Sequence, residues 1–307
     1  MAEDTVYYAL NPHALVKLKG KIIAKKSTKY QDIVVFDSKM LGRTMLIGVG
    51  DYLVIQFSLR DEAHYHEALV HIPMALYPNP KKVLIIGGGD GGSLREVLKH
   101  PVDKVILAEL DDGIINIVKE YFPSLPNGAF DDPRVEIKIG DGKKFISQTD
   151  EKFDAIILDL TDPEGPSKML FTKEFYQLLK SKMTKGGTLS VQTGSPFFED
   201  KVSGRVHAAL SEVFRNTVTY ANFVQSFFIV ASYTLATDSP ISGIAQRLKE
   251  RNIPLNAYTP QELEYLILHP NPYVRDVLSK KWNPSTDADP VDISEIRDPY
   301  KQKEPLE

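Results

Sequence analysis

The sequence predicts an α/β fold in which a small N-terminal antiparallel β domain precedes a mostly parallel sheet with helices on both faces. Two observations predict it. Before residue 70, β-branched and aromatic runs are separated by Gly, Asp, Ser and Lys, as in short strands joined by turns. From residue 81 onward, apolar runs alternate with amphipathic segments at helical spacing, which is the pattern of βαβ units.

The N-terminal part contains four expected strands and one helix. The strands are expected at residues 22–24, 33–36, 44–47 and 52–56. Apolar residues at helical spacing then predict a helix over residues 61–76, which ends before Pro78. We expect the strands to form a small antiparallel sheet and the helix to lead into the next domain.

The central part alternates strands and helices and ends in two closely spaced strands. Strands are expected at 83–86, 105–107, 135–139, 155–158 and 188–191, and helices at 94–99, 114–121, 172–180 and 202–214. Residues 217–223 and 227–235 then read as an antiparallel hairpin at the sheet edge. A closing hairpin of this kind is typical of a methyltransferase-like Rossmann domain.

The C-terminal part is mixed. Helices are expected at 244–251 and 261–268, and the chain after Trp282 is rich in Asp and Pro, which predicts partial disorder. We therefore divide the chain into a β domain at 1–70, a Rossmann-like domain at 71–237 and a C-terminal tail at 238–307.

Composition excludes several classes of protein. The 307 residues include no cysteine, which excludes disulfides, thiolate nucleophiles and Cys-ligated metal centres. A net charge of −4 argues against a nucleic-acid-binding protein, because such proteins carry a strongly basic face. Apolar stretches of about ten residues or fewer fall short of the ~20 that cross a bilayer, and the acidic N-terminus does not resemble a secretory signal. We expect a cytoplasmic protein with no membrane or nucleic-acid partner.

The clearest motif is the glycine-rich turn GGGDGG at residues 87–92, between a strand and a helix. Glycines here allow a tight turn and a close approach of the backbone to a ligand. A turn without any ligand is the alternative, but Asp90 is informative. A carboxylate would repel a pyrophosphate and attract a cation, so the turn predicts a positively charged ligand.

Carboxylates follow the next two strands. Glu109 and Asp111 come after the second strand, where Rossmann-type domains bind the two ribose hydroxyls of an adenosine. Asp141 and Gly142 follow the third strand and suit hydrogen bonding to an adenine edge. A solvated charge at Glu109 and an ordinary Asp-Gly turn are the alternatives.

The fourth strand ends in the loop DLTDPEGP, with Asp159 and Asp162 three residues apart. Two carboxylates on a Pro-stiffened loop beside the crevice can face one ligand. Crowded carboxylates near a cation can bind an ammonium group and accept a proton from it. For Asp162, and also for Asp159, an N-cap of the following helix is the alternative.

The N-terminal segment adds aromatic and polar candidates. Tyr30 and Gln31, then Gln56, then Tyr65 and His66 can cover an alkyl chain or an amine, and aromatic rings attract cations. His66 alone is more often a buried, hydrogen-bonded histidine. The sequence contains no HExxH pattern, so we predict no metal site.

Taken together, these motifs resemble the spermidine synthase, or polyamine aminopropyltransferase, family. The resemblance covers roughly residues 20–235 and rests on KYQDI, RDE…YHE, GGGDGGSLREVLKH, FDDPRVEIKIGDG, D-x-T-D-P-x-G-P and LFTKEFY. It implies transfer of an aminopropyl group from decarboxylated S-adenosylmethionine, as co-substrate, to an amine. The product is 5′-methylthioadenosine, no cofactor is bound permanently, and the family forms homodimers or homotetramers.

The resemblance also implies residue roles. The residues expected to hold the thioadenosine donor are Gln31, Asp90, Glu109, Asp141, Gly142 and Pro166. The residues expected at the amine acceptor are Tyr65, His66, Asp90, Asp159, Asp162 and Gln192. Asp159 is expected to accept the proton of the attacking amine.

Departures from the family pattern concern the acceptor. Leu160 stands where Ser or Thr is usual, and Glu164 where a small apolar residue is usual. The family's longer Pro-Thr-Tyr-Pro-Ser-Gly loop, whose tyrosine contacts putrescine, is replaced by YANFVQSFFIVAS, as in the thermospermine- or triamine-forming branch. We expect spermidine or agmatine to be preferred to putrescine. Two alternatives stay open: a methyltransferase that uses intact S-adenosylmethionine, and a non-catalytic polyamine- or nucleoside-binding protein.

Overall fold

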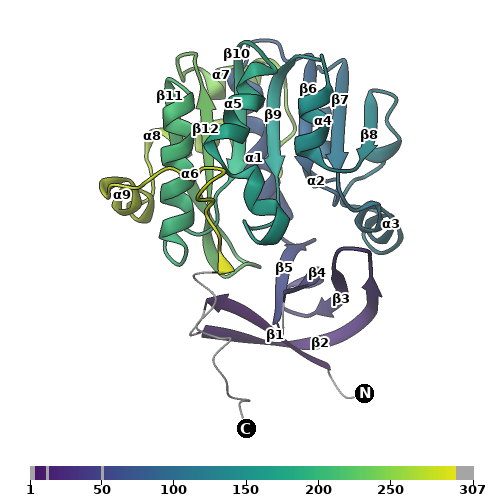
Figure 1. Ribbon diagram of the computed structural model, residues 1–307. Helices are drawn as coiled ribbons and strands as arrows, with labels where there is room; N and C mark the ends of the chain where they lie inside the picture. The colour runs from purple at the N-terminus through teal and green to yellow at the C-terminus, as the bar shows by residue number, and fades with distance from the viewer. Residues whose placement is uncertain (1–3, 12–13, 50–51, 295–307) are drawn as a thin grey trace.

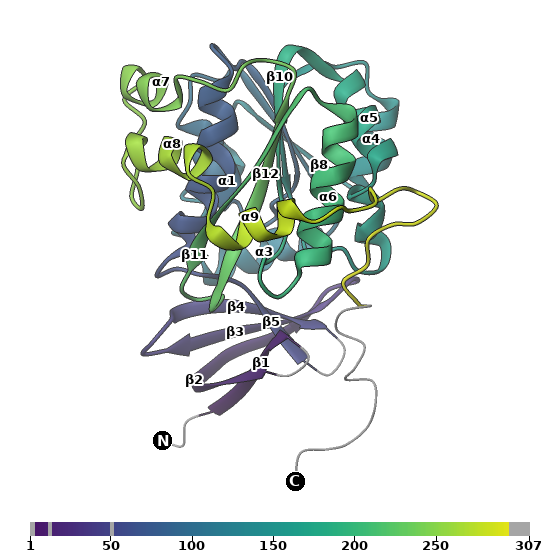
Figure 2. The same cartoon turned by 90° about the vertical axis from the view of Figure 1, so that its left-hand side faces the viewer.

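The computed structural model describes residues 4–11, 14–49 and 52–294. A β-barrel lies below a larger α/β layer structure in Figures 1 and 2. The predicted fold class, a mostly parallel sheet with helices on both faces and a small antiparallel β domain, is confirmed. Within the described ranges, every helix is too short or too polar to cross a bilayer.

The N-terminal barrel has five strands, one more than the sequence predicts. They are β1 (Asp4–Asn11), β2 (Ala14–Ser27), β3 (Asp32–Ser38), β4 (Gly42–Val49) and β5 (Tyr52–Ser58). Successive strands pair antiparallel, and Tyr8 pairs with Leu53 in parallel to close the barrel. The predicted antiparallel sheet is confirmed, but β1 and the closure were not predicted. Closure leaves no free sheet edge.

Helix α1 (Glu62–Leu76) joins the barrel to the α/β layers, as predicted. Most of its side chains are buried against the parallel sheet, so the predicted domain boundary at residue 70 falls inside this helix. Pro73 lies within the helix, and its carbonyl accepts a hydrogen bond from Thr188 Oγ1.

The parallel sheet has the strand order β11-β12-β10-β9-β6-β7-β8. Its members are β6 (Lys82–Gly87), β7 (Lys104–Glu109), β8 (Val135–Ile139), β9 (Phe153–Asp159), β10 (Met183–Gln192), β11 (Asn216–Val224) and β12 (Ile229–Thr237). β12 runs antiparallel to both neighbours, β10 and β11, so the predicted closing hairpin is confirmed. The order reverses direction between β6 and β9, and ligands bind at such switch points.

Two apolar cores lie on the two faces of this sheet, because alternate strand residues point to opposite faces. Val83 and Ile85 pack on the side of α1, α2 (Gly92–Leu98), α3 (Asp112–Tyr121), α7 (Ile244–Glu250) and α8 (Pro260–Leu268). Leu84 and Ile86 pack on the side of α4 (Gly142–Gln148), α5 (Lys173–Ser181) and α6 (Asp200–Val213). Figure 2 shows the two helical layers on either side of the sheet.

The sequence missed two helices and two short 3₁₀ turns. Helix α4 follows Asp141, for which an ordinary turn was only the alternative interpretation, and α9 (Pro272–Ser279) lies in the tail. The 3₁₀ turns are η1 (Ala129–Asp131) and η2 (Gly165–Leu170). The two helices have only seven and eight residues, so each offers too few turns for a helical period to stand out in the sequence.

The expected disorder after Trp282 is wrong for residues 283–294. Val291 and Ile293 are fully buried in the second core, and Lys173 donates its backbone N–H to Ser285 O. A few buried apolar side chains are enough to hold this segment on the domain, although its overall composition is polar. Residues 295–307 lie outside the described residues.

Candidate active site

A cavity of about 890 Å³ lies between the barrel and the carboxyl ends of the central parallel strands. The barrel contributes Tyr8, Met45 and Gln56, while the sheet contributes the glycine turn and the loop after β9. This is the crevice at the switch point between β6 and β9. Among the expected donor and acceptor residues whose side chains the structure describes, all line the cavity except His66.

The glycine turn packs closely against the backbone of Asp159 and the carboxylate of Glu109. Gly87 has φ of +80°, and a Cβ at this residue would overlap the backbone carbonyl oxygen of Asp159. A Cβ on Gly89 would lie 2.9 Å from Oε2 of Glu109. The glycines therefore let the turn pack between β9 and β7, which places Asp90 at the cavity wall.

Asp159 ends β9, and each of its carboxylate oxygens accepts a hydrogen bond. Tyr65 Oη donates to Oδ1 at 2.9 Å, and Ser93 Oγ donates to Oδ2 at 2.7 Å. Burial raises the pKa of Asp159, and the nearby negative charge of Asp90 raises it further. An oriented carboxylate with raised proton affinity is suited to accept a proton.

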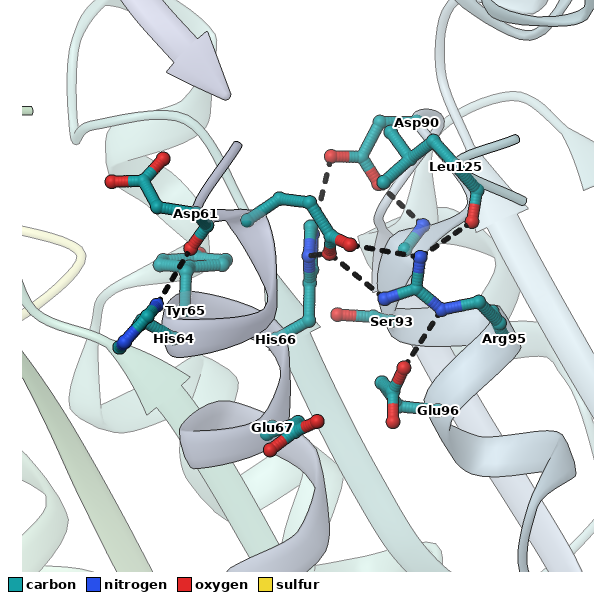
Figure 3. A network of polar contacts seen from close by, with 12 residues as sticks. Asp61, His64, Tyr65, His66, Glu67, Asp90, Ser93, Arg95, Glu96 and Leu125 are labelled. Atoms are coloured by element: carbon teal, nitrogen blue, oxygen red, sulfur yellow. Dashed lines mark hydrogen bonds and ion pairs between the residues drawn. The ribbon is translucent and has the colours of Figure 1, made fainter. Parts of the chain in front are cut away.

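Asp90 is held from behind by its own turn and by α1. Its Oδ1 accepts the Gly92 N–H at 2.8 Å, and its Oδ2 lies 3.3 Å from His66 Nε2. His66 is 1% exposed and does not line the cavity. Figure 3 shows the His66 ring on α1 with Asp90 at one end. The structure thus gives His66 no face toward an acceptor and places it as a support of Asp90.

Glu109 and Asp111 form a second polar group at the end of β7. The Asp111 N–H donates to Glu109 Oε1 at 2.9 Å, and burial raises the pKa of Glu109 to about 7. Asp111 Oδ2 accepts hydrogen bonds from Thr28 Oγ1 at 2.6 Å and Gln31 Nε2 at 3.2 Å. The barrel segment around Gln31 is therefore fastened to the sheet at this point.

Asp141 and Gly142 lie at the start of α4. Asp141 is the N-cap, and its Oδ1 accepts the N–H groups of Lys143 at 2.8 Å and Lys144 at 3.1 Å. The alternative of an ordinary Asp-Gly turn is wrong, because the pair starts a helix, and both residues also line the cavity.

The loop after β9 forms the remaining wall. Asp162 and Glu164 line the cavity, and the Asp162 carbonyl accepts a hydrogen bond from Ser167 Oγ at 2.7 Å. Gln192 donates Nε2–H to Leu160 O at 3.0 Å and so supports the loop. Pro166 is the second residue of η2, and its side chain lies outside the described part of the structure.

Two clusters have the side-chain types of a metal site. His66, Asp90 and Asp159 have ligand atoms within 4.8 Å of one another, as do Glu67, His71 and Glu96. Hydrogen bonds account for both clusters: Glu67 accepts backbone N–H groups, and His71 Nε2 lies 2.8 Å from Glu96 Oε2. The prediction of no metal site stays a prediction.

Several supporting residues were not singled out from the sequence. They are Thr28, Glu62, Ser93 and Arg95. Glu62, Ser93 and Arg95 stand inside the motifs RDE and GGSLRE, but nothing in the sequence relates one motif to the other. The Glu62–Arg95 pair depends on the packing of α1 on α2, whereas Ser93 bonds to Asp159 of β9 and Thr28 bonds to Asp111 after β7.

Comparison with known proteins identifies the family. The family model described as "Spermine/spermidine synthase domain" matches residues 62–239. A polyamine aminopropyltransferase of Korarchaeum cryptofilum is 35% identical over 292 residues, covering 92% of this chain and 90% of that protein. This chain belongs to the spermine/spermidine synthase family. It is an aminopropyltransferase, a transferase of polyamine biosynthesis.

Further relatives of this family agree over nearly the whole chain. A polyamine aminopropyltransferase of Nitrosomonas europaea is 33% identical, covering 95% of this chain and 91% of that protein. A crystal structure of a spermidine synthase in complex with the transition-state analogue AdoDATO has a TM-score of 0.82 and 34% identity, covering 90% of this chain and 95% of that one. The spermidine synthase of Thermotoga maritima has a TM-score of 0.79 and 33% identity, with 90% and 94% covered. The family resemblance predicted from the motifs is confirmed.

Proposed function

We propose that this aminopropyltransferase moves the aminopropyl group of decarboxylated S-adenosylmethionine to an amine and releases 5′-methylthioadenosine. The observation that carries the proposal is Asp90, a carboxylate in the glycine turn and on the cavity wall. Decarboxylation leaves a cationic amine at the end of the propyl arm, which this carboxylate attracts. Intact S-adenosylmethionine would bring its own carboxylate against the same negative charge.

The donor nucleoside would lie along the ends of β7 and β8. Glu109 would accept hydrogen bonds from the ribose hydroxyls, and Gln31 would bind beside it. Asp141 and Gly142 would bind the adenine, and Pro166 is proposed beside them from the family pattern. Gln31, Glu109 and the Asp141–Gly142 pair come from three separate segments that all line the cavity.

The acceptor would lie beside Asp159, and Asp159 would accept its proton. The amine nitrogen attacks the methylene carbon bonded to the sulfonium, the carbon–sulfur bond breaks, and its electron pair stays on sulfur as a neutral thioether. The proton of the attacking nitrogen passes to Asp159. The protein therefore orients the two substrates and removes one proton, with no covalent enzyme intermediate.

For the acceptor we propose a longer amine, spermidine or agmatine, in preference to putrescine. Asp162 and Glu164 lie along the cavity beyond Asp159, and Tyr65 and Gln192 complete the wall. A second ammonium group on a longer acceptor would form an ion pair with the Glu164 carboxylate. His66 is proposed to act on the acceptor indirectly, through Asp90.

The assembly and location of the protein are also proposals. A homodimer or homotetramer formed through the barrel is supported by the exposed Tyr7, Leu15 and Met40 on that domain. We propose that the enzyme works in the cytoplasm. Light scattering on the purified protein would test the assembly, and a monomer at micromolar concentration would reject it.

The experiment that tests the reaction is product analysis by mass spectrometry. Purified protein is incubated with decarboxylated S-adenosylmethionine and, in parallel, putrescine, agmatine, cadaverine, spermidine or norspermidine. Methylthioadenosine together with an aminopropylated amine is expected, with the highest initial rate for spermidine or agmatine. Fastest turnover of putrescine would reject the acceptor preference. Methyl transfer from intact S-adenosylmethionine, or no product from any amine, would reject the proposed reaction.

A further inference from the structure

His66 lies between two carboxylates, one on each ring nitrogen. Nδ1 is 2.7 Å from Oε2 of Glu62, one helical turn earlier on α1, and Nε2 is 3.3 Å from Oδ2 of Asp90. A neutral imidazole has only one N–H, whereas an ionised carboxylate only accepts hydrogen bonds. Both contacts are hydrogen bonds only if His66 carries a proton on each nitrogen.

Glu62 is itself held as an anion. Arg95 of α2 donates from both terminal nitrogens to its two oxygens, at 3.0 and 2.8 Å, and also binds Leu125 O and Glu96 (Figure 3). Burial alone would raise the pKa of Glu62, but His66 and Arg95 lower it to about 2. The partner of Nδ1 is therefore a fixed negative charge.

The orientation of the Asp90 carboxylate follows from this arrangement. With the Gly92 N–H on one oxygen and His66 on the other, each oxygen of Asp90 has a fixed partner within the protein. His66 has no freedom to move off, because it is 1% exposed and a Cβ on Gly92 would already overlap its ring. The carboxylate plane of Asp90 is thus set by a histidine that no substrate touches.

We propose that Glu62 is a positioning residue of this active site, which holds His66 doubly protonated so that the imidazolium orients Asp90 and faces Asp159. The role assigned here to Asp159 rests on the proposed function. The protonation of His66 and the orientation of Asp90 rest on the contacts alone.

The charged and titratable groups around His66 come from four elements. Glu62 and Tyr65 are on α1, Asp90 is in the glycine turn, Asp159 ends β9, and Arg95 of α2 acts through Glu62. Burial alone would lower the pKa of His66, but Asp90 and Glu62 raise it well above its ordinary value. In turn, the His66 charge lowers the pKa of Asp159 against the effects of burial and Asp90.

The first test is NMR on protein labelled with ¹⁵N-histidine and free of substrate. The chain has seven histidines, so His66→Gln identifies the signal by its loss. The wild-type His66 signal is expected at the imidazolium position at pH 8. In Glu62→Gln a neutral ring is expected at pH 8, and in Glu62→Asp the charge is expected to return. A neutral wild-type His66, or a fully charged one in Glu62→Gln, would overturn the proposal.

The second test is the pH dependence of kcat/KM in the same variants. Without the cation, the pKa of Asp159 rises, so the acidic limb of the profile is expected to move upward by about one to three pH units. A fall of about a hundredfold is expected at neutral pH, and raising the pH should recover part of it. Glu212→Gln, an exposed carboxylate paired with Lys173, is the control and should match wild type.

The two tests distinguish a failure of the positioning role of Glu62 and His66 from a failure of the proposed reaction. An unshifted profile in a variant whose His66 is neutral would overturn the electrostatic role of the pair. An enzyme inactive with every donor and amine would count against the proposed function, while the NMR result would still decide the state of His66. Circular dichroism melts identify any variant that fails to fold. If Glu62→Gln does not fold, Glu62→Asp is compared with wild type in its place.

Discussion

Tyr65 and Asp159 lie 94 positions apart in the chain and are joined by a 2.9 Å hydrogen bond from the phenol to Oδ1. The bond links the first helix to the end of the fourth parallel strand. Ser93 holds the other oxygen at 2.7 Å, so the carboxylate is oriented from both sides. A small change at Asp159 therefore tests the chemistry with little change to the framework.

Asp159→Asn removes the proton acceptor while keeping its shape. We expect turnover to fall by about a hundredfold to ten-thousandfold, since positioned proton acceptors contribute on this scale. Donor binding, measured by calorimetry, is expected to persist. Asp150→Asn, an exposed position, is the control. Unchanged turnover in Asp159→Asn would remove this residue from its assigned role.

Gly92→Ala tests the packing of the glycine turn on His66. A Cβ at Gly92 would overlap the imidazole, so the ring or the turn must move. We expect a loss of about 1–3 kcal/mol in unfolding free energy, together with reduced kcat/KM. Gly48→Ala is the matched control, because its Cβ would meet only Asp32 at 3.4 Å. Equal unfolding free energies for Gly92→Ala and wild type would contradict the close packing.

Glu109 predicts a pH dependence of stability. Burial raises its pKa in the folded protein to about 7 from an ordinary value of about 4.5, so the native state keeps a proton that the unfolded chain releases. The resulting stability is present below pH 4.5 and is lost as the pH rises through 7. Urea unfolding at pH 4.5 and 7.5 should show this loss in wild type and less of it in Glu109→Gln. The same pH dependence in both proteins would refute the assignment.

Glu164 tests the preference for a longer acceptor. Replacing it with Gln removes the proposed partner of a second ammonium group, so kcat/KM for spermidine is expected to fall about tenfold, the scale of a charged hydrogen bond. Putrescine turnover should change little. Glu120→Gln, whose side chain is 58% exposed, is the control. Equal losses for both amines would argue against a role for Glu164 in selecting length.

Ile293 tests the ordered tail. Its side chain is fully buried, its N–H donates to Pro163 O at 2.9 Å, and the neighbouring Asp292 pairs with Lys168 at 3.1 Å. Ile293→Ala should cost about 2–4 kcal/mol of unfolding free energy and raise the acceptor KM, because the loop after β9 loses its support. Leu268→Ala, at a residue 62% exposed, should change neither. An unchanged acceptor KM in Ile293→Ala would show that the tail does not support the loop after β9.

The sequence predicted the features that a local pattern of residues encodes, namely the strands, the helices and the motifs at strand ends. Alternating apolar runs predicted the sheet and its helices, because burial on both faces leaves a periodic signature. The motifs also placed carboxylates such as Asp90, Glu109 and Asp159 at consecutive strand ends, and parallel strands bring those ends to one edge. The family and the cavity-lining residues follow from these local features.

Only the tertiary structure decided the relations between distant segments. His66 was expected at the acceptor, yet packing of α1 on α2 buries it behind Asp90 and pairs it with Glu62 and Arg95. Barrel closure at Tyr8 and Leu53 and the burial of Ile293 likewise depend on contacts between segments that are separated in the sequence. Such contacts leave no periodic mark in the sequence, because each is made by single residues whose partners are set by how whole elements pack.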